Sequence, residues 1–138
     1  MNVIFDSAPT KDDVDQLNKL LLEFNKSKII DYSYNDFIIR FEDSSKELLG
    51  AIHCIIGGDW LYIDSLWVKE TSRNQGIGKK LVKMAESEAI KQKCIGIYLY
   101  TYSFQNPKFY EHLGFSEFGS LDKFAKDHRK QYMLKTLV

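Results

Sequence analysis

The part of this sequence with the clearest chemical potential is Arg73-Asn74-Gln75-Gly76-Ile77-Gly78-Lys79, where two glycines end a polar loop and open a helical pattern. Glycine lets the backbone approach a ligand closely, because it carries no side chain. The first N–H groups of a helix have no partner within the helix, and the helix dipole makes that end positive. The segment therefore predicts a backbone anion site suited to a pyrophosphate.

Two common nucleotide-binding motifs do not fit this loop. A Walker A loop places Ser or Thr after Gly-Lys, whereas Lys80 follows Gly78-Lys79 here. A dinucleotide fingerprint needs a third glycine, which would fall at Leu81. That fingerprint also follows the first strand of a parallel sheet, whereas this loop follows three predicted antiparallel strands. The expected ligand is therefore another compound that contains phosphate.

A second candidate segment is Asn106-Pro107-Lys108-Phe109-Tyr110-Glu111-His112-Leu113-Gly114, a short helix opened by proline and closed by glycine. Asn106 and Tyr110 are four residues apart and lie on one face of this helix. Asn106 is either the helix N-cap or a ligand contact, and both roles are compatible. Tyr110 either acts as a proton donor or is a packed aromatic side chain.

The two segments together resemble the GNAT acetyltransferase superfamily. Its signature is Arg/Gln-x-x-Gly-x-Gly/Ala after a strand, and its second block carries Asn, then Phe-Tyr on a short helix, then Gly-Phe. The stretch Trp67-Val68-Lys69-Glu70 is also similar to the family's strand end before the loop. The resemblance covers Trp60–Val138, while the N-terminal third carries no motif of its own.

The resemblance implies acetyl-CoA as co-substrate and a specific set of contacts. The pyrophosphate would lie on the N–H groups of Arg73–Gly78, with Lys79 close behind. The strand edge Leu66-Trp67-Val68 would pair with the pantetheine arm like an added strand. Asn106 would contact the pantetheine, and Tyr110 would protonate the departing thiolate.

The general base is the least determined part of the expected site. An amine with a pKa near 10.4 must lose a proton before it attacks a thioester at neutral pH. Asp64 lies on the strand that leads to the loop, on the same side as Leu66 and Val68 by simple alternation. It is a candidate base or a solvated strand carboxylate, and Glu70 is a weaker candidate.

The hydrophobic periodicity predicts a mixed α/β fold, and the resemblance implies that this fold is of the GNAT type. We expect a mostly antiparallel sheet of about six or seven strands, flanked by helices, with one parallel strand-helix-strand crossover between residues 60 and 100. Residues 1–138 should form a single domain. The expected strands are 3–5, 37–41, 48–56, 60–68, 94–101, 115–118 and 129–137, with helices after Thr10, from Ile77 and from Pro107.

Composition narrows the class of partner. The 138 residues carry 19 basic and 19 acidic side chains, so the chain lacks the basic surplus typical of nucleic-acid binders. No apolar run approaches the roughly 20 residues that cross a bilayer, and no signal peptide is recognisable at the N-terminus. Cys54 and Cys94 have no metal-ligand spacing and are expected to be buried free thiols, so no metal site is predicted. These features predict a cytoplasmic protein.

The expected activity is direct transfer of acetyl to a primary amine of a small molecule or a protein lysine, without a covalent acyl-enzyme. The alternative is a non-catalytic module that binds or senses coenzyme A. A longer acyl donor stays open, because the sequence does not reveal pocket volume. A homodimer is plausible in this superfamily, although no residue pattern indicates one.

Overall fold

The computed structural model describes residues 1–138, and its internal contacts divide the chain into two compact units, Met1–Tyr32 and Ser33–Val138. The expectation of one domain over residues 1–138 stays a prediction. None of the helices is both long and apolar enough to cross a lipid bilayer.

The first unit contains helix α1, Lys11–Lys28. Thr10 and Asp13 form a capping box, in which the Thr10 side chain accepts from the Asp13 N–H at 3.1 Å and the Asp13 carboxylate accepts from the Thr10 N–H at 3.0 Å. The expected strand at Val3–Phe5 is wrong. Those residues form neither helix nor strand, because no other segment pairs with them and a strand requires a ladder partner.

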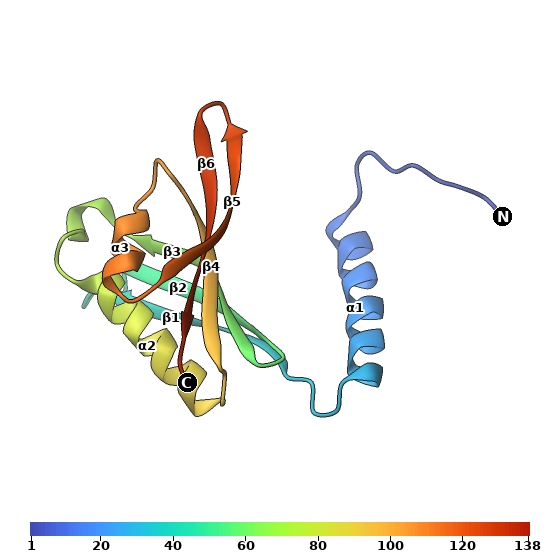
Figure 1. Cartoon of the computed structure of the whole chain (residues 1–138), viewed down its shortest axis with the longest axis horizontal. Coiled ribbons are helices and arrows are strands. Elements are labelled where there is room, and N and C mark those ends of the chain that lie inside the picture. Colours follow the sequence, from blue (N-terminus) through green and yellow to red (C-terminus); the bar gives the residue numbers. More distant parts are fainter. The chain divides into compact units, whose positions relative to one another are not determined.

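The second unit is built on a six-stranded sheet with the order β1-β2-β3-β4-β6-β5, and Figure 1 shows helices α2 and α3 on one side of it. All neighbouring strands are antiparallel except β3 and β4. This confirms the mixed sheet with one parallel crossover. The elements are β1 Tyr34–Glu42, β2 Leu48–Gly57, β3 Trp60–Val68, a 3-10 turn Glu70–Ser72, α2 Ile77–Lys91, β4 Gly96–Tyr102, α3 Pro107–His112, β5 Ser116–Ala125 and β6 His128–Thr136.

The hydrophobic core lies between α2 and the sheet. On α2 the buried side chains recur at helical spacing, at Leu81, Val82, Ala85 and Ala89. They pack against alternate residues of the strands, which belong to one cluster: Ile52, Cys54, Ile56, Leu61, Ile63, Ile97, Leu99 and Met133. Both cysteines are free and buried, as expected.

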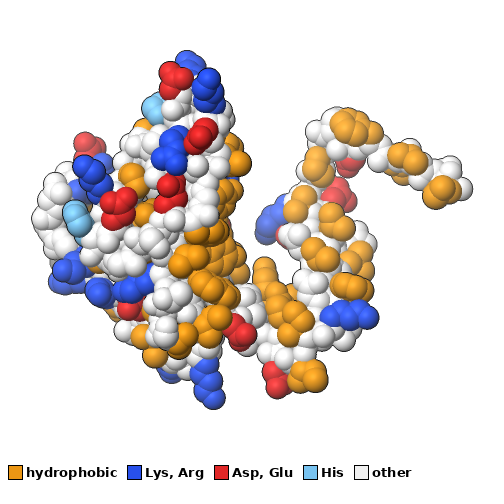
Figure 2. Space-filling view, in the orientation of Figure 1, with side chains coloured by type: hydrophobic (Ala, Val, Ile, Leu, Met, Phe, Trp, Pro, Cys, Tyr) orange, Lys and Arg blue, Asp and Glu red, His pale blue; other side chains and the backbone are white.

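The opposite face of the sheet is rich in half-exposed aromatic rings. Trp60, Tyr62, Tyr98, Tyr100 and Tyr132 form a continuous series of ring contacts with centroid distances between 4.9 and 6.5 Å. Figure 2 shows hydrophobic side chains gathered on the side of this unit where β4 and β6 lie, and charged ones over its helices.

Strand β5 is longer than expected, whereas β6 matches the expected strand at 129–137 to within one residue. Only Lys126 and Asp127 connect β5 to β6, so the predicted short strand at 115–118 with a long connection is wrong. The hairpin instead carries polar pairs, such as Arg129 with Asp122 at 3.0 Å and with Glu117 at 2.9 Å. Because these side chains are polar, the sequence of β5 after Phe118 shows no alternation of apolar and polar residues, and it was predicted to be a loop.

Candidate active site

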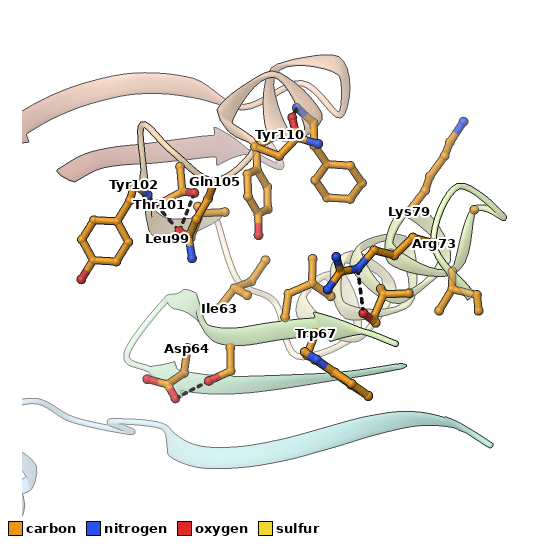
Figure 3. Close-up of a pocket in the computed structure, with 18 of the residues that line it drawn as sticks. Ile63, Asp64, Trp67, Arg73, Lys79, Leu99, Thr101, Tyr102, Gln105 and Tyr110 are labelled. Carbon is orange, nitrogen blue, oxygen red and sulfur yellow. Dashed lines mark hydrogen bonds between the residues drawn. The ribbon is translucent and has the colours of Figure 1, made fainter. Parts of the chain in front are cut away.

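A cleft of about 810 Å³ opens where β3 and β4 separate. The two strands pair only over Trp60–Tyr62 with Gly96–Tyr98, although β3 pairs with β2 along its whole length. Its volume lies in the range of small-molecule sites. Figure 3 shows the side chains that line it, which come from β3, the loop before α2, the start of α2, β4 and α3.

The loop before α2 lies at one end of the cleft, where backbone N–H groups have no side-chain cap. Gly76 is the N-cap residue in a left-handed conformation, with φ 81°, and Asn74 also has a positive φ of 63°. No side chain caps α2 and its first turn holds no acidic residue, in contrast to the capping box of α1. A Cβ on Gly76 would meet nothing within 4 Å, so the space in front of these N–H groups is open. The arrangement suits an anionic ligand.

The two glycines of the loop are needed for different reasons. Gly76 provides the positive φ that a side chain would strain. Gly78 makes room for α3, because a Cβ there would lie 3.3 Å from the ring of Phe109. Arg73 ties the loop to the end of β3 through Nε, which donates to the Val68 carbonyl at 3.1 Å. The loop is therefore held between β3 and α3.

The free edge of β3 forms one wall of the cleft. Leu66 and Val68 pair with Ile52 and Gly50 of β2, and neither pairs with a residue of β4, although the Val68 carbonyl accepts from Nε of Arg73. Backbone groups on such an edge can pair with an extended ligand in the manner of an added strand. Trp67 lies between them and is 47% exposed.

Tyr110 enters the cleft from α3, and Figure 3 shows its hydroxyl pointing into the space above β3. Its ring makes edge contacts with Phe109 at 5.0 Å and Phe115 at 5.8 Å. Burial raises the pKa of Tyr110 to about 12. The phenol is therefore neutral at physiological pH and can donate one hydrogen bond into the cleft.

Asn106 and Gln105 occupy the turn between β4 and α3. The Asn106 side chain accepts from the Phe109 N–H at 3.3 Å, so its capping role is present in the structure, and the residue also lines the cleft. Gln105 accepts from the Thr101 hydroxyl at 3.1 Å and from the Tyr102 N–H at 2.9 Å. This amide fixes the end of β4 beside the cleft.

Asp64 lines the cleft, but on a different face from the one predicted. Register shifts between β2 and β3 leave Asp64 as an extra residue, since Cys54 pairs with Ile63 and His53 pairs with Ser65. This bulge breaks the alternation, so Leu66 packs against the core while Asp64 joins His53 on the opposite face. The expectation that Asp64 shares a side with Leu66 and Val68 is therefore wrong.

The structure brings most of the predicted residues to one cleft. The predicted residues that line it are Asp64, Leu66, Trp67, Val68, Arg73, Asn74, Gly76, Ile77, Gly78, Lys79, Asn106 and Tyr110. Gln75 does not, because its side chain turns back to the Thr71 carbonyl at 3.4 Å. Glu70 also lies outside the lining.

Sequence reasoning missed several lining residues. The cleft is also lined by residues that neither sequence motif marks as ligand contacts, namely Ser72, Tyr100, Thr101, Tyr102, Gln105 and Phe109. Their position in the chain could have identified most of them. They lie near the end of β4, and ligands commonly bind where parallel strands separate.

A second, shallower depression adjoins the loop. It is lined by Phe41, Gly76, Lys79, Lys80, Lys83 and Met84, and it shares Gly76 and Lys79 with the cleft. Three lysines there form a positive surface on the first turns of α2. A ligand with phosphates at both positions would find donors in each.

Known proteins share this sequence and architecture. The profile of the acetyltransferase (GNAT) family matches residues 6–115. An acetyltransferase of Agrobacterium fabrum is 30% identical over 121 residues, which are 88% of each chain. The blasticidin-S acetyltransferase of Streptomyces morookaense is 32% identical over 92 residues, covering 66% of this chain and 68% of that one. A crystal structure described as an acetyltransferase from Agrobacterium tumefaciens superposes with a TM-score of 0.91 at 27% identity, covering 99% of this chain and 100% of that one.

Proposed function

Because this chain belongs to the acetyltransferase (GNAT) family, we propose that it transfers an acetyl group from acetyl-CoA directly to a primary amine. The observation that carries this proposal is the cleft between β3 and β4, with the uncapped start of α2 at one end and the Tyr110 hydroxyl inside it. The GNAT family uses acetyl-CoA, and the residues of the cleft suit that molecule.

Acetyl-CoA supplies a thioester carbonyl to the acceptor and leaves as a thiolate. In this chain the N–H groups between Arg73 and Lys79 would hold its pyrophosphate, and the free edge of β3 at Leu66–Val68 would hold the pantetheine. Asn106 can offer its Nδ2 to the same arm while its Oδ1 caps α3. Of the groups on this edge, the Val68 carbonyl already accepts from Nε of Arg73, so the pantetheine would pair mainly with the backbone of Leu66.

Tyr110 would stabilise the departing sulfur by donating a hydrogen bond. A thiol of this kind has a pKa near 8.5. Full proton transfer from a phenol with a pKa of about 12 is therefore uphill by about 5 kcal/mol, at 1.36 kcal/mol per pKa unit. Tyr110 acts as a donor to the developing thiolate, which leaves in ionised form and takes its proton from solvent, while the amine gives its own proton to the base.

Asp64 is the proposed base. A free alkylamine with a pKa near 10.4 is neutral in only about one molecule in a few thousand at pH 7, so a carboxylate at the cleft would help to remove its proton. Direct transfer is supported by the cysteines, since neither lines the cleft. Burial raises the pKa of Cys54 to about 12 and also raises the pKa of Cys94, which makes both poor nucleophiles.

The acceptor is a primary amine of a small molecule or of a protein. The similarity to a blasticidin-S acetyltransferase supports a small molecule. The alternative from another class is a module that binds coenzyme A without turnover. A longer acyl donor, a homodimer and a cytoplasmic location stay predictions.

A thiol-release assay tests the proposal. Purified protein is mixed with acetyl-CoA and a panel of amines, including diamines, aminoglycosides, blasticidin S and a lysine peptide, and products are identified by mass spectrometry. We expect thiol release that depends on one amine class, with one acetyl group added to that amine. Binding of acetyl-CoA without transfer to any amine would favour the non-catalytic alternative.

A further inference from the structure

A hydrogen-bonded series of three side chains crosses β1, β2 and β3 on the sheet face away from α2. Nε2 of His53 lies 2.8 Å from Oδ2 of Asp36, and Nδ1 of His53 lies 3.2 Å from Oδ2 of Asp64. The neighbours of His53 on β2, Ile52 and Cys54, are fully buried in the core, so the imidazole lies on the other face. The series joins an exposed carboxylate to the carboxylate that lines the cleft.

The cleft end of this series is held in one orientation. Oδ2 of Asp64 receives the hydrogen bond from His53 and a second one from the Ser65 hydroxyl at 3.1 Å. Both bonds use the same oxygen, which leaves Oδ1 without a protein partner. The bulge in β3 presents the residue at this position, and bulges commonly re-aim a side chain next to active sites.

The outer end anchors the imidazole. The side chain of Asp36 is 66% exposed and that of His53 is 28% exposed. The hydrogen bond that His53 donates to Asp36 is the largest cause that raises the pKa of His53, burial opposes it, and Asp64 adds to the rise. No other charged side chain forms an ion pair with either carboxylate. Both ring nitrogens therefore face carboxylate oxygens, which fixes the ring in its plane.

We propose that His53 is a positioning residue that, anchored by Asp36, holds the Asp64 carboxylate so that its free oxygen meets the acceptor amine. The inference rests on the proposed function, because Asp64 serves as a base only if an amine is acetylated in the cleft. As the N–C bond forms and the C–S bond breaks, the proton leaves the amine nitrogen for Asp64. His53 keeps its own protons in this step.

Two substitutions of His53 distinguish the roles of its two ring nitrogens. An Asn side chain at position 53 places its amide nitrogen near the site of Nδ1, and Gln places it near the site of Nε2. His53→Asn should keep the bond to Asp64 and a kcat within about threefold of wild type, whereas His53→Gln and His53→Ala should lower kcat about tenfold or more. The KM for acetyl-CoA should be unchanged in all three. Equal kcat in the Asn and Gln variants, or a change confined to KM, would contradict a positioning role.

A double substitution tests whether the effect passes through Asp64. In an Asp64→Asn background, His53→Gln should lower kcat no further, because the group that it positions is already absent. Multiplicative losses would show that His53 acts elsewhere and would overturn the inference.

A nuclear magnetic resonance titration of the histidine rings tests the series without turnover. The His53 ring should titrate above the ordinary value near 6.5, and Asp36→Asn should move it down. An ordinary wild-type value would refute the series whatever the activity. An intact series in a protein that transfers acetyl to no amine would instead refute the proposed function, and the positioning role with it.

Discussion

Tyr110 and Asp64 both line the cleft, one from α3 and one from β3. The surroundings of Tyr110 fix its protonation, because its ring packs beside Phe109 and Phe115 and burial raises its pKa to about 12. A neutral donor is what a departing thiolate requires. We therefore expect the hydroxyl of Tyr110 to stabilise the transition state more than it stabilises the bound ground state.

Replacing Tyr110 with Phe should separate catalysis from binding. The ring contacts remain, so the affinity for acetyl-CoA should change little, while kcat should fall about 10²-fold because one hydrogen-bond donor to the developing charge is lost. Steady-state kinetics and calorimetry measure the two quantities. Tyr102→Phe is the matched control, since its hydroxyl points away from Tyr110 in Figure 3, and it should keep kcat within about threefold. Equal losses in both variants would contradict the role of Tyr110.

At this scale the sequence predicted the residues that follow a motif and missed those that depend on register. The loop from Arg73 to Lys79 and the pair Asn106 and Tyr110 were predicted from their motifs together with the resemblance to the family, and all of them except Gln75 line the cleft. The sheet face on which Asp64 lies was predicted wrongly. An extra residue in β3 reverses the alternation of side chains, and no residue type in the sequence indicates this bulge. The orientation of Gln75 away from the cleft likewise depends on a local bond to Thr71.

At the scale of elements, the close approach of α2 to β2 places the anion site. A Cβ on Gly50 would lie 2.8 Å from Cγ2 of Ile77 and 3.3 Å from Cδ1 of Leu81, so glycine allows the start of the helix to approach the strand. The first N–H groups of α2 are thereby brought to the end of the β3 edge.

Gly50→Ala should therefore destabilise the fold and weaken acetyl-CoA binding together. Overpacking at this contact should cost about 1–3 kcal/mol of the free energy of unfolding, as measured by denaturant titration. Gly119→Ala on β5 is the matched control, because a Cβ there would meet nothing within 4 Å. Similar stability in both variants would show that α2 does not depend on the small residue.

The lysines of α2 predict discrimination at a second phosphate. Lys80 and Lys83 line the depression beside Gly76, and coenzyme A carries a ribose 3′-phosphate in addition to its pyrophosphate. Lys83→Ala should weaken coenzyme A by about three- to tenfold, as expected for one partly screened charge contact, and leave dephospho-coenzyme A unchanged. Competition binding measures both ligands. An equal loss for both would place the 3′-phosphate elsewhere.

The elements themselves were predicted well where burial imposes a period. Strand β2 alternates more and less buried residues, β3 does so as far as its bulge at Asp64, and α2 buries one stripe at helical spacing, as their sequences indicate. The strand predicted at Val3–Phe5 is absent because a strand needs a pairing partner, and the local sequence does not show whether a partner exists. Strand β5 was predicted too short because it is exposed along nearly its whole length and carries Glu117 and Asp122, which pair with Arg129, in place of an apolar face.

At the scale of the whole molecule, the buried hydrophobic core lies entirely within Ser33–Val138, the unit that also contains the cleft. The cleft borders this core through Ile63, Leu99 and Tyr110. A ligand bound there contacts groups that are assembled only in the folded state, so its binding free energy adds to stability.

Acetyl-CoA at a hundred times its dissociation constant should stabilise the protein by about 2.7 kcal/mol. For a chain of this size that corresponds to a rise in Tm of roughly 10 °C, measurable by scanning calorimetry. The matched control is the acetyl thioester of pantetheine, which lacks the pyrophosphate and should give a smaller shift at the same concentration. Equal shifts would indicate that the loop before α2 contributes nothing to binding.

Calorimetric titration of acetyl-CoA into wild type, Gly76→Asn and Gly76→Asp tests directly whether the start of α2 holds the pyrophosphate. Asn and Asp both tolerate the left-handed backbone of Gly76 and have nearly the same shape, so they differ by one negative charge in front of the α2 N–H groups. We predict that wild type and the Asn variant bind acetyl-CoA, and that the Asp variant binds at least tenfold more weakly because its carboxylate repels the pyrophosphate. Equal binding by the two variants would place the pyrophosphate elsewhere, and no binding by wild type would contradict the acetyltransferase assignment of this cleft.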